Sequence, residues 1–241
     1  MILLGKSTRE RLQQDPFGNW FNKNYSDYTV DTATANQLKP FLQNKHFTIF
    51  MGTWCGDSRR EVPRIYKLLD YCGIPLSQVQ LINVNSSDTA YKQSPGHEER
   101  GLNIHRVPDL LVYDNDKEIG RVIESPIKSW EKDLFAITTG QAYEPNYKGV
   151  IFISKLFQSS SPADMRKNML QLSDQLRPLV QNRYELNSYG NIQLSLHETE
   201  KALLLYQLNT LLFPNEPEVW NSLAAAITSM AVNTKTENSG H

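Results

Sequence analysis

The sequence predicts an α/β fold with a mixed β-sheet flanked by helices over residues 1–145, followed by an all-helical segment over residues 146–232. Two observations lead to this prediction. Short apolar strands alternate with helical patterns as far as Gly140, and the last two strands stand in hairpin order. From about Pro162 onward the apolar residues follow only a helical period. Alternating strands and helices form a layered α/β domain, whereas a purely helical pattern forms a helical one.

Each element of the first part follows from a local pattern. A helical lead-in is expected from about Ser7 to Leu42, and the apolar run His46–Met51 predicts a buried strand. Gly73 and Pro75 end the next helix, and Ser129 caps the last one. The other expected elements are a helix from about Ser58 to Tyr71, strands at Val79–Val84, Asp109–Tyr113 and Glu118–Ile123, and a helix from Trp130 to about Thr138.

Three stretches between and after these elements are expected to lack regular structure. Asn85 to Gly101 is polar and contains a Pro-Gly turn signal, so it predicts a loop. The domain boundary is expected near Tyr143 to Lys148, where Pro145 interrupts the helical pattern. The tail, residues 233–241, is polar and is predicted to be disordered.

Composition narrows the classes of function. A net charge of -1 gives no field that would recruit nucleic acid or an anionic membrane. No apolar run approaches the ~18 to 20 residues that span a bilayer, and the first residues do not form a signal peptide. Two cysteines and five scattered histidines offer neither a disulfide framework nor zinc-ligand spacing. We therefore expect a cytoplasmic protein without metal, cofactor, nucleic-acid partner or membrane partner.

The strongest chemical signal is the run Trp54-Cys55-Gly56-Asp57-Ser58, which stands between a predicted strand and a predicted helix. Such a turn exposes the thiol of Cys55 at the helix N-terminus. Free backbone amides and the helix dipole favour the thiolate there, and the thiolate is the nucleophilic form of cysteine. A second signal is Val107-Pro108 just before an apolar strand, where a proline is a candidate for a cis peptide bond.

These residues resemble the thioredoxin family. The Trp-Cys-Gly-x-Ser turn after a buried strand is similar to the family's active-site turn, and Pro63 lies where thioredoxins carry a helix-kinking proline. The stretch from Ile104 to Tyr113 resembles the cis-proline loop and the strand that follows it. The resemblance covers roughly residues 31–140. It implies a thioredoxin-like fold in which Cys55, Ser58 and Pro108 carry the catalytic site, with Trp54 as a wall.

The sequence also departs from the family pattern. Ser58 replaces the second cysteine, Asp57 stands where thioredoxins have proline, and Ile49 occupies the position of the family's buried acid. A dithiol reductase needs a resolving thiol to expel its substrate. Cys72 is expected near the far end of the same helix, about 25 Å away, which is too far for a disulfide. It is expected to be a buried structural residue.

The expected function is therefore oxidoreductase-like thiol–disulfide chemistry through one reactive cysteine, without an internal resolving cysteine. Cys55 would form a mixed disulfide with a protein or a low-molecular-weight thiol. Ser58 is a candidate hydrogen-bond donor to the thiolate, and Asp57 opposes the thiolate because a nearby carboxylate disfavours it. Three arginines, Arg59, Arg60 and Arg106, either offset Asp57 or hold an acidic group of a partner, whereas His105 is expected to be a solvated loop residue.

Two other interpretations stay open or are set aside. The fold is alternatively a non-catalytic scaffold, in which Cys55 is an ordinary residue and the helical tail binds a partner. The run Gly56-Asp57-Ser58 also resembles the motif of Gly-Asp-Ser-Leu esterases. Those enzymes need a late histidine, usually three residues after an aspartate. No Asp-x-x-His occurs in the chain, and Arg59 follows the serine, so the esterase interpretation is disfavoured.

The helical segment contains an internal period of 34 residues. Trp220, Leu223 and Ala224 follow Leu186, Tyr189 and Gly190 at this spacing. Together with Ala202, Tyr206 and Pro214, this spacing resembles the tetratricopeptide repeat. It is also similar to the short repeat tail of some bacterial serine hydrolases. Only one and a half repeats are visible, so the segment is either a peptide-binding groove or a structural cap.

Overall fold

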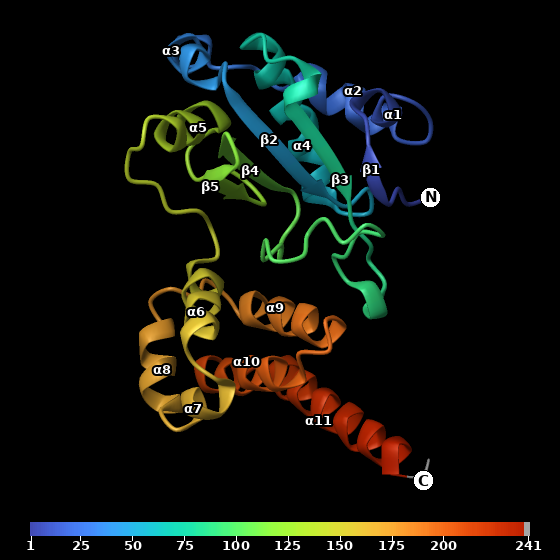
Figure 1. Ribbon diagram of the computed structural model, residues 1–241, viewed down its shortest axis with the longest axis vertical. Coiled ribbons are helices and arrows are strands. Elements are labelled where there is room, and N and C mark those ends of the chain that lie inside the picture. Colours follow the sequence, from blue (N-terminus) through green and yellow to red (C-terminus); the bar gives the residue numbers. More distant parts are fainter. Residues whose placement is uncertain (239–241) are drawn as a thin grey trace. The chain divides into compact units, whose positions relative to one another are not determined.

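The computed structural model describes residues 1–238, and of residues 229–238 only the backbone. The chain forms two compact units, Met1–Asn146 and Tyr147–His241, which we call unit 1 and unit 2 (Figure 1). The boundary between these units lies one residue after the one predicted from the sequence, between residues 145 and 146. Unit 1 is a mixed α/β unit with a five-stranded sheet, and the described part of unit 2 is helical.

The sheet of unit 1 has the order β1-β3-β2-β4-β5. Its strands are β1 (Gly5–Ser7), β2 (Lys45–Met51), β3 (Val79–Asn83), β4 (Asp109–Asp114) and β5 (Lys117–Ile123). The central strand β2 pairs parallel to β3 and antiparallel to β4, so that Ile49 lies between Leu81 and Leu110. The sequence predicts β2, β3 and the β4–β5 hairpin. The edge strand β1 was not, because three residues are too few to show an alternating pattern.

The helical lead-in is broken into three helices, α1 (Arg9–Leu12), α2 (Gly18–Asp27) and α3 (Thr32–Leu42). The sequence analysis had treated this stretch as one helical region. Thr8 and Asp31 each begin a new helix, because their side-chain oxygens accept the backbone N–H groups of Arg11 and Thr34. A capping side chain satisfies the first amides of a helix, so a cap within a helical pattern marks the start of a new helix.

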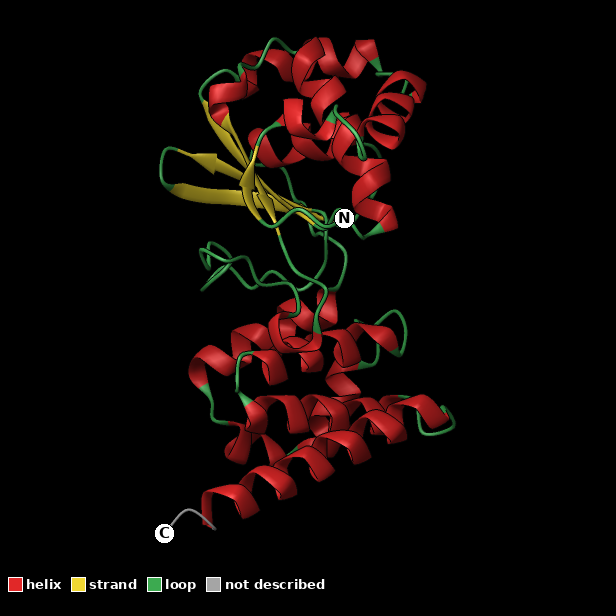
Figure 2. Cartoon of the chain, turned by 90° about the vertical axis from the view of Figure 1, so that its right-hand side faces the viewer, coloured by secondary structure: helices red, strands yellow, loops and turns green. Residues whose placement is uncertain are grey.

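One face of the sheet is covered by helices (Figure 2). These are α2 and α3 together with α4 (Gly56–Tyr71) and α5 (Trp130–Thr138). Ile49, Met51 and Leu110 point into this layer and pack in one buried cluster with Val62 and Leu134 from the helices. Burial of such side chains stabilises the layer by about 1.5–3 kcal/mol each.

The opposite face of the sheet carries a smaller cluster beneath a loop. Phe50, Ile82 and Leu111 point to this side and pack against Ile104 and Val107. The segment between β3 and β4 that covers them contains only a 3-10 turn, η2 (Asp88–Ala90), and is otherwise a loop, as the sequence predicts. A second 3-10 turn, η1 (Leu76–Gln78), precedes β3. This loop ends at Pro108, directly before β4.

Unit 2 is built from six helices in its described residues. They are α6 (Lys148–Ser159), α7 (Pro162–Arg166), α8 (Met169–Leu176), α9 (Tyr184–Ser195), α10 (Thr199–Leu212) and α11 (Pro217–Asn238). Gly190 on α9 fits against Tyr206 on α10, where an added Cβ would lie 2.7 Å from the ring. Asn209 Nδ2 also donates to the Arg183 carbonyl at 2.8 Å. These contacts hold α9 and α10 together as a hairpin.

Two features of unit 2 differ from the sequence analysis. Helix α6 begins at Lys148, inside the stretch expected to be a linker. Helix α11 continues to Asn238, through the first six residues of the tail predicted to be disordered, and residues 239–241 lie outside the described residues. No glycine or proline interrupts α11 after Pro217, so nothing in its backbone chemistry ends the helix earlier. None of the helices in the described residues is both long and apolar enough to cross a membrane.

Candidate functional site

Cys55 lies at the junction between β2 and α4, as the sequence predicts. It is the residue that precedes the helix, with an extended backbone at φ -85° and ψ 127°, and its carbonyl accepts the Arg59 N–H at 3.1 Å. A tight turn leads into it, because the Cys55 N–H donates to the Gly52 carbonyl at 2.9 Å. Gly52 is required in this turn, since a Cβ there would lie 2.5 Å from the Trp54 ring. The thiol is partly exposed.

The loop before β4 meets this thiol. The Val107–Pro108 peptide bond is cis, which confirms the sequence-based prediction for this bond. Cys55 Sγ donates to the Val107 carbonyl at 3.3 Å, across 52 residues of sequence. Thus the two segments singled out in the sequence come together at hydrogen-bond distance.

Ser58 is fully buried one turn into α4. Its Oγ accepts the Gly52 N–H at 3.2 Å, so the hydroxyl closes the turn that carries Cys55. The structure gives no hydrogen bond between Ser58 and Cys55 in the described part of the chain. The hydroxyl oxygen therefore holds the turn in this structure. Accepting this bond does not use the hydroxyl hydrogen, so the donor role of Ser58 toward the thiolate stays a prediction.

Charged side chains near the turn are paired with one another. Asp57 lies 2.7 Å from Arg60 on the surface, which offsets the carboxylate charge next to Cys55. Arg59 Nε donates to the Thr53 carbonyl at 2.7 Å and so fixes the turn from the helix side. Arg106, in the loop before Pro108, lies 3.8 Å from Glu124. Of the two roles considered for the arginines, the structure shows charge compensation at Asp57.

The side chain of Trp54, next to Cys55 in the sequence, is held by two contacts. Its indole Nε1 donates to the Val84 carbonyl at 2.9 Å, and its ring centroid lies 6.3 Å from that of Tyr91. Both partners belong to the loop between β3 and β4. Trp54 therefore joins the Cys55 turn to that loop.

Lys92, which the sequence analysis did not single out, is buried in the same loop. Only 3% of its surface is exposed, and Nζ donates to the His105 carbonyl at 2.6 Å. Burial, followed by the nearby Arg106, lowers the pKa of Lys92 to about 7, whereas the charges of Cys55 and Glu124 raise it. The polar sequence around Lys92 predicts a solvated loop. The adjacent pair Tyr91-Lys92 does not by itself indicate that the lysine is buried near Cys55.

His105 is also buried, contrary to the expectation that it is a solvated loop residue. Ile104 and Val107, on either side of it, belong to the apolar cluster under the loop and draw the segment inward. Burial lowers the pKa of His105 to about 3, and its Nδ1 lies 3.1 Å from the Asn103 carbonyl. Its imidazole is therefore neutral at physiological pH and has no proton to donate as an acid in that range.

A buried carboxyl group follows Pro108 directly. Asp109 is fully buried and lies 3.3 Å from Arg121, whereas Ile49 on the neighbouring strand lies in the apolar core. Burial raises the pKa of Asp109 to about 7, although Arg121 opposes this shift. Arg121 also donates to the Leu102 carbonyl at 2.8 Å, so the pair ties the end of the loop to β4 and β5.

Cys72 lies at the opposite end of α4, as expected. It is fully buried, and burial raises the pKa of its thiol to about 11. Its Sγ lies 3.9 Å from the Ala35 carbonyl in the apolar core. Among the two cysteines, only Cys55 has the exposure that a nucleophile needs.

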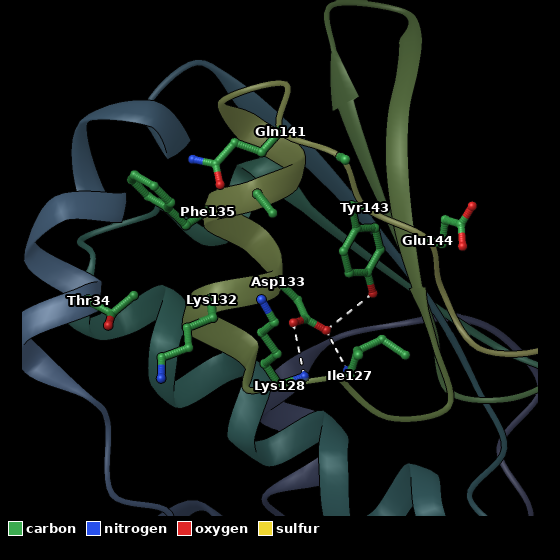
Figure 3. A pocket seen from close by; sticks show the side chains of 11 residues that line it. Thr34, Ile127, Lys128, Lys132, Asp133, Phe135, Gln141, Tyr143 and Glu144 are labelled. Atoms are coloured by element: carbon green, nitrogen blue, oxygen red, sulfur yellow. Dashed lines mark hydrogen bonds between the residues drawn. The ribbon is translucent and has the colours of Figure 1, made fainter.

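A cavity of about 300 Å³ lies apart from Cys55, between α5 and the segments on either side of it (Figure 3). Lys128 and Lys132 are exposed at it, and Asp133 is buried within it. The Asp133 carboxylate accepts the backbone N–H of Lys128 at 3.1 Å and the hydroxyl of Tyr143 at 3.2 Å. These bonds hold the loop before α5 in place, so the carboxylate is satisfied by the fold itself and the cavity is not the candidate site.

Comparisons with protein families, with curated proteins and with solved structures find no match to this chain. In the described residues, no group of three or more His, Cys, Asp or Glu side chains is placed to hold a metal ion.

Proposed function

We propose that unit 1 is a thioredoxin-like domain that acts through Cys55 in thiol–disulfide chemistry of the single-cysteine kind. The observation that carries this proposal is the meeting of Cys55 Sγ with the Val107 carbonyl at 3.3 Å. The order of elements supports it as well: a central strand leads into the cysteine turn and α4, and a β4–β5 hairpin follows the Val107–Pro108 bond.

The proposed step is an exchange at sulfur. The Cys55 thiolate attacks one sulfur of a disulfide, a new S–S bond forms, the old one breaks, and the other half leaves as a thiolate. The product is a mixed disulfide with a protein or a low-molecular-weight thiol. Ser58 has no sulfur with which to resolve it, and Cys72 is buried at the other end of α4. A second external thiol must therefore attack the mixed disulfide and regenerate Cys55.

The first prediction concerns which thiol reacts. With an aromatic disulfide probe near neutral pH, Cys55 should be modified at least about 100-fold faster than Cys72, because only a partly exposed thiolate can reach the probe. The adduct should persist until an external thiol is added. Rates followed by probe absorbance, with the modified peptide identified by mass spectrometry, would measure both properties. Cys55→Ser and Cys72→Ala are the matched variants.

Two outcomes would defeat this function. One is a Cys72 that reacts as fast as Cys55 in the folded protein. The other is an adduct that the wild-type chain clears without added thiol, which would require a resolving group other than those identified. Denatured protein, in which both cysteines react alike, provides the reference rate.

A second candidate function is a non-catalytic interaction role of unit 2, which we propose is a tetratricopeptide-like segment. The α9–α10 hairpin supports this, because Gly190 packs against Tyr206 and both belong to the pattern that resembles the tetratricopeptide repeat. Large apolar side chains lie exposed on this unit, among them Tyr184, Trp220 and Ile227. If this is the function, a partner should still bind the Cys55→Ser variant and should bind Trp220→Ala more weakly. The reverse pattern would favour the thiol chemistry.

A further inference from the structure

Lys92 is an unusual residue for the interior of a protein. Lysine is almost never fully buried without a partner, because removal of an ammonium group from water is costly. Here only 3% of the residue is exposed. Its backbone is also in the left-handed region, at φ 57°. The loop between β3 and β4 thus turns this side chain inward rather than leaving it in solvent.

The contacts of Lys92 connect it to the wall of the Cys55 site. Its Nζ donates to the His105 carbonyl at 2.6 Å, two residues before Val107, whose own carbonyl accepts from Cys55. Nζ also lies 4.7 Å from the centre of the Tyr91 ring, and that ring packs against Trp54. Both aromatic and carbonyl contacts favour the charged form of the amine.

Charged or titratable groups that act on Lys92 through space include Arg106, Cys55 and Glu124. Arg106 disfavours the ammonium, whereas a Cys55 thiolate and Glu124 favour it. His105, whose carbonyl binds Lys92, is neutral above a pKa of about 3 and adds no charge at physiological pH. Burial outweighs the favourable charges, so the pKa of Lys92 falls to about 7 and the amine changes charge near neutral pH.

We propose that Lys92 is a positioning residue for the chemistry of Cys55, and that its buried ammonium stabilises the thiolate on Cys55 Sγ. The proposal rests on the proposed function of Cys55 and adds the group that balances its charge. Electrostatic interaction is reciprocal: if the thiolate favours the ammonium, the ammonium favours the thiolate to the same extent. Because the loop excludes water around Nζ, this attraction is screened less than one between exposed charges.

The first test is the pH profile of Cys55 alkylation in a Cys72→Ala background. Lys92→Met should react about tenfold more slowly than the parent near pH 6.5, because it lacks the cation, and the two rates should converge at high pH. Lys92→Arg, which keeps a charge, should stay within about threefold of the parent at the lower pH. Lys128→Met, an exposed lysine at the cavity beside α5, is the control and should follow the parent throughout.

The second test leaves Lys92 intact, so it does not depend on whether the variants fold. Lys92 is titrated by NMR before and after Cys55 is capped as a methyl disulfide, which removes the thiolate. The pKa of Lys92 should be lower in the capped protein, because the favourable charge has gone. An unchanged Lys92 titration, or a Lys92→Met profile that overlays the parent in a folded protein, would overturn the proposal.

The two proposals fail in different ways. If Cys55 reacts with a disulfide no faster than Cys72, the proposed function is wrong, whatever the Lys92 titration shows. If Cys55 reacts selectively but neither test detects coupling, the function stands and the inference about Lys92 is wrong.

Discussion

At the scale of single residues, the site is a set of small side chains and backbone groups that hold one thiol in place. Cys55 receives its position from the Gly52 carbonyl and from the Val107 carbonyl. Ser58 supports the turn from within α4 by accepting the Gly52 N–H. Ser58 is thus a structural part of the turn. Its removal should lower the free energy of unfolding rather than change the lifetime of the mixed disulfide.

Replacing Ser58 separates these two properties. Ser58→Ala leaves the Gly52 N–H without its acceptor, so the free energy of unfolding should fall by about 1–3 kcal/mol, while the mixed disulfide should remain long-lived. Ser58→Cys should instead shorten the lifetime of the adduct, because it offers a thiol one turn from Cys55. Urea denaturation and adduct decay without added thiol measure the two effects. An alanine variant that clears its adduct would show that the hydroxyl itself protects the disulfide.

Most elements of unit 1 could be predicted because they carry strong local patterns. The apolar run before Cys55 predicts β2, Gly73 indicates the end of α4, and Ser129 indicates the start of α5. The prediction failed where long-range packing decides the structure. No pattern in the polar stretch Asn85 to Gly101 shows that Lys92 turns inward, because its burial depends on Trp54 and His105, which are distant in sequence.

Helix α4 contains Pro63, yet it continues without a break to Tyr71. Proline lacks the N–H that would bond the carbonyl four residues earlier, which belongs to Arg59. That carbonyl instead accepts Asn24 Nδ2 from α2 at 3.2 Å. The neighbouring helix therefore supplies the donor that the proline lacks, and the packing of α2 on α4 explains how the proline is accommodated.

This arrangement predicts a coupling between two helices. Asn24→Ala should cost about 0.5–1.5 kcal/mol, because the Arg59 carbonyl loses its side-chain donor. In a Pro63→Ala background the cost should be smaller, since residue 63 then has an N–H that can bond the same carbonyl. A double-mutant cycle by urea denaturation measures the difference. Strictly additive effects would mean that the Asn24 bond contributes nothing to the accommodation of Pro63.

At the scale of the whole molecule, two buried groups of unit 1 make the stability of the protein depend on pH in opposite directions. Asp109 has its pKa raised to about 7, so folding favours the protonated acid. Its contribution to the free energy of unfolding is complete below a pH of about 3.9, the pKa of aspartate in the unfolded chain. This contribution is lost as the pH rises through about 7. His105 has its pKa lowered to about 3, so its contribution is present above about 6.5 and is lost as pH falls.

Because the two slopes overlap between about pH 4 and pH 6.5, they partly cancel in the wild-type protein, and the test has to compare variants. Asp109→Asn removes the carboxyl that must ionise in the core. Its free energy of unfolding, relative to wild type, should therefore rise by about 1 kcal/mol or more between about pH 4.5 and pH 7.5. His105→Gln should show the reverse, with its advantage over wild type growing as pH falls. Urea denaturation across this range measures both differences. A difference for Asp109→Asn that stays constant or falls with rising pH would mean that Arg121 outweighs burial and keeps Asp109 ionised in the folded protein.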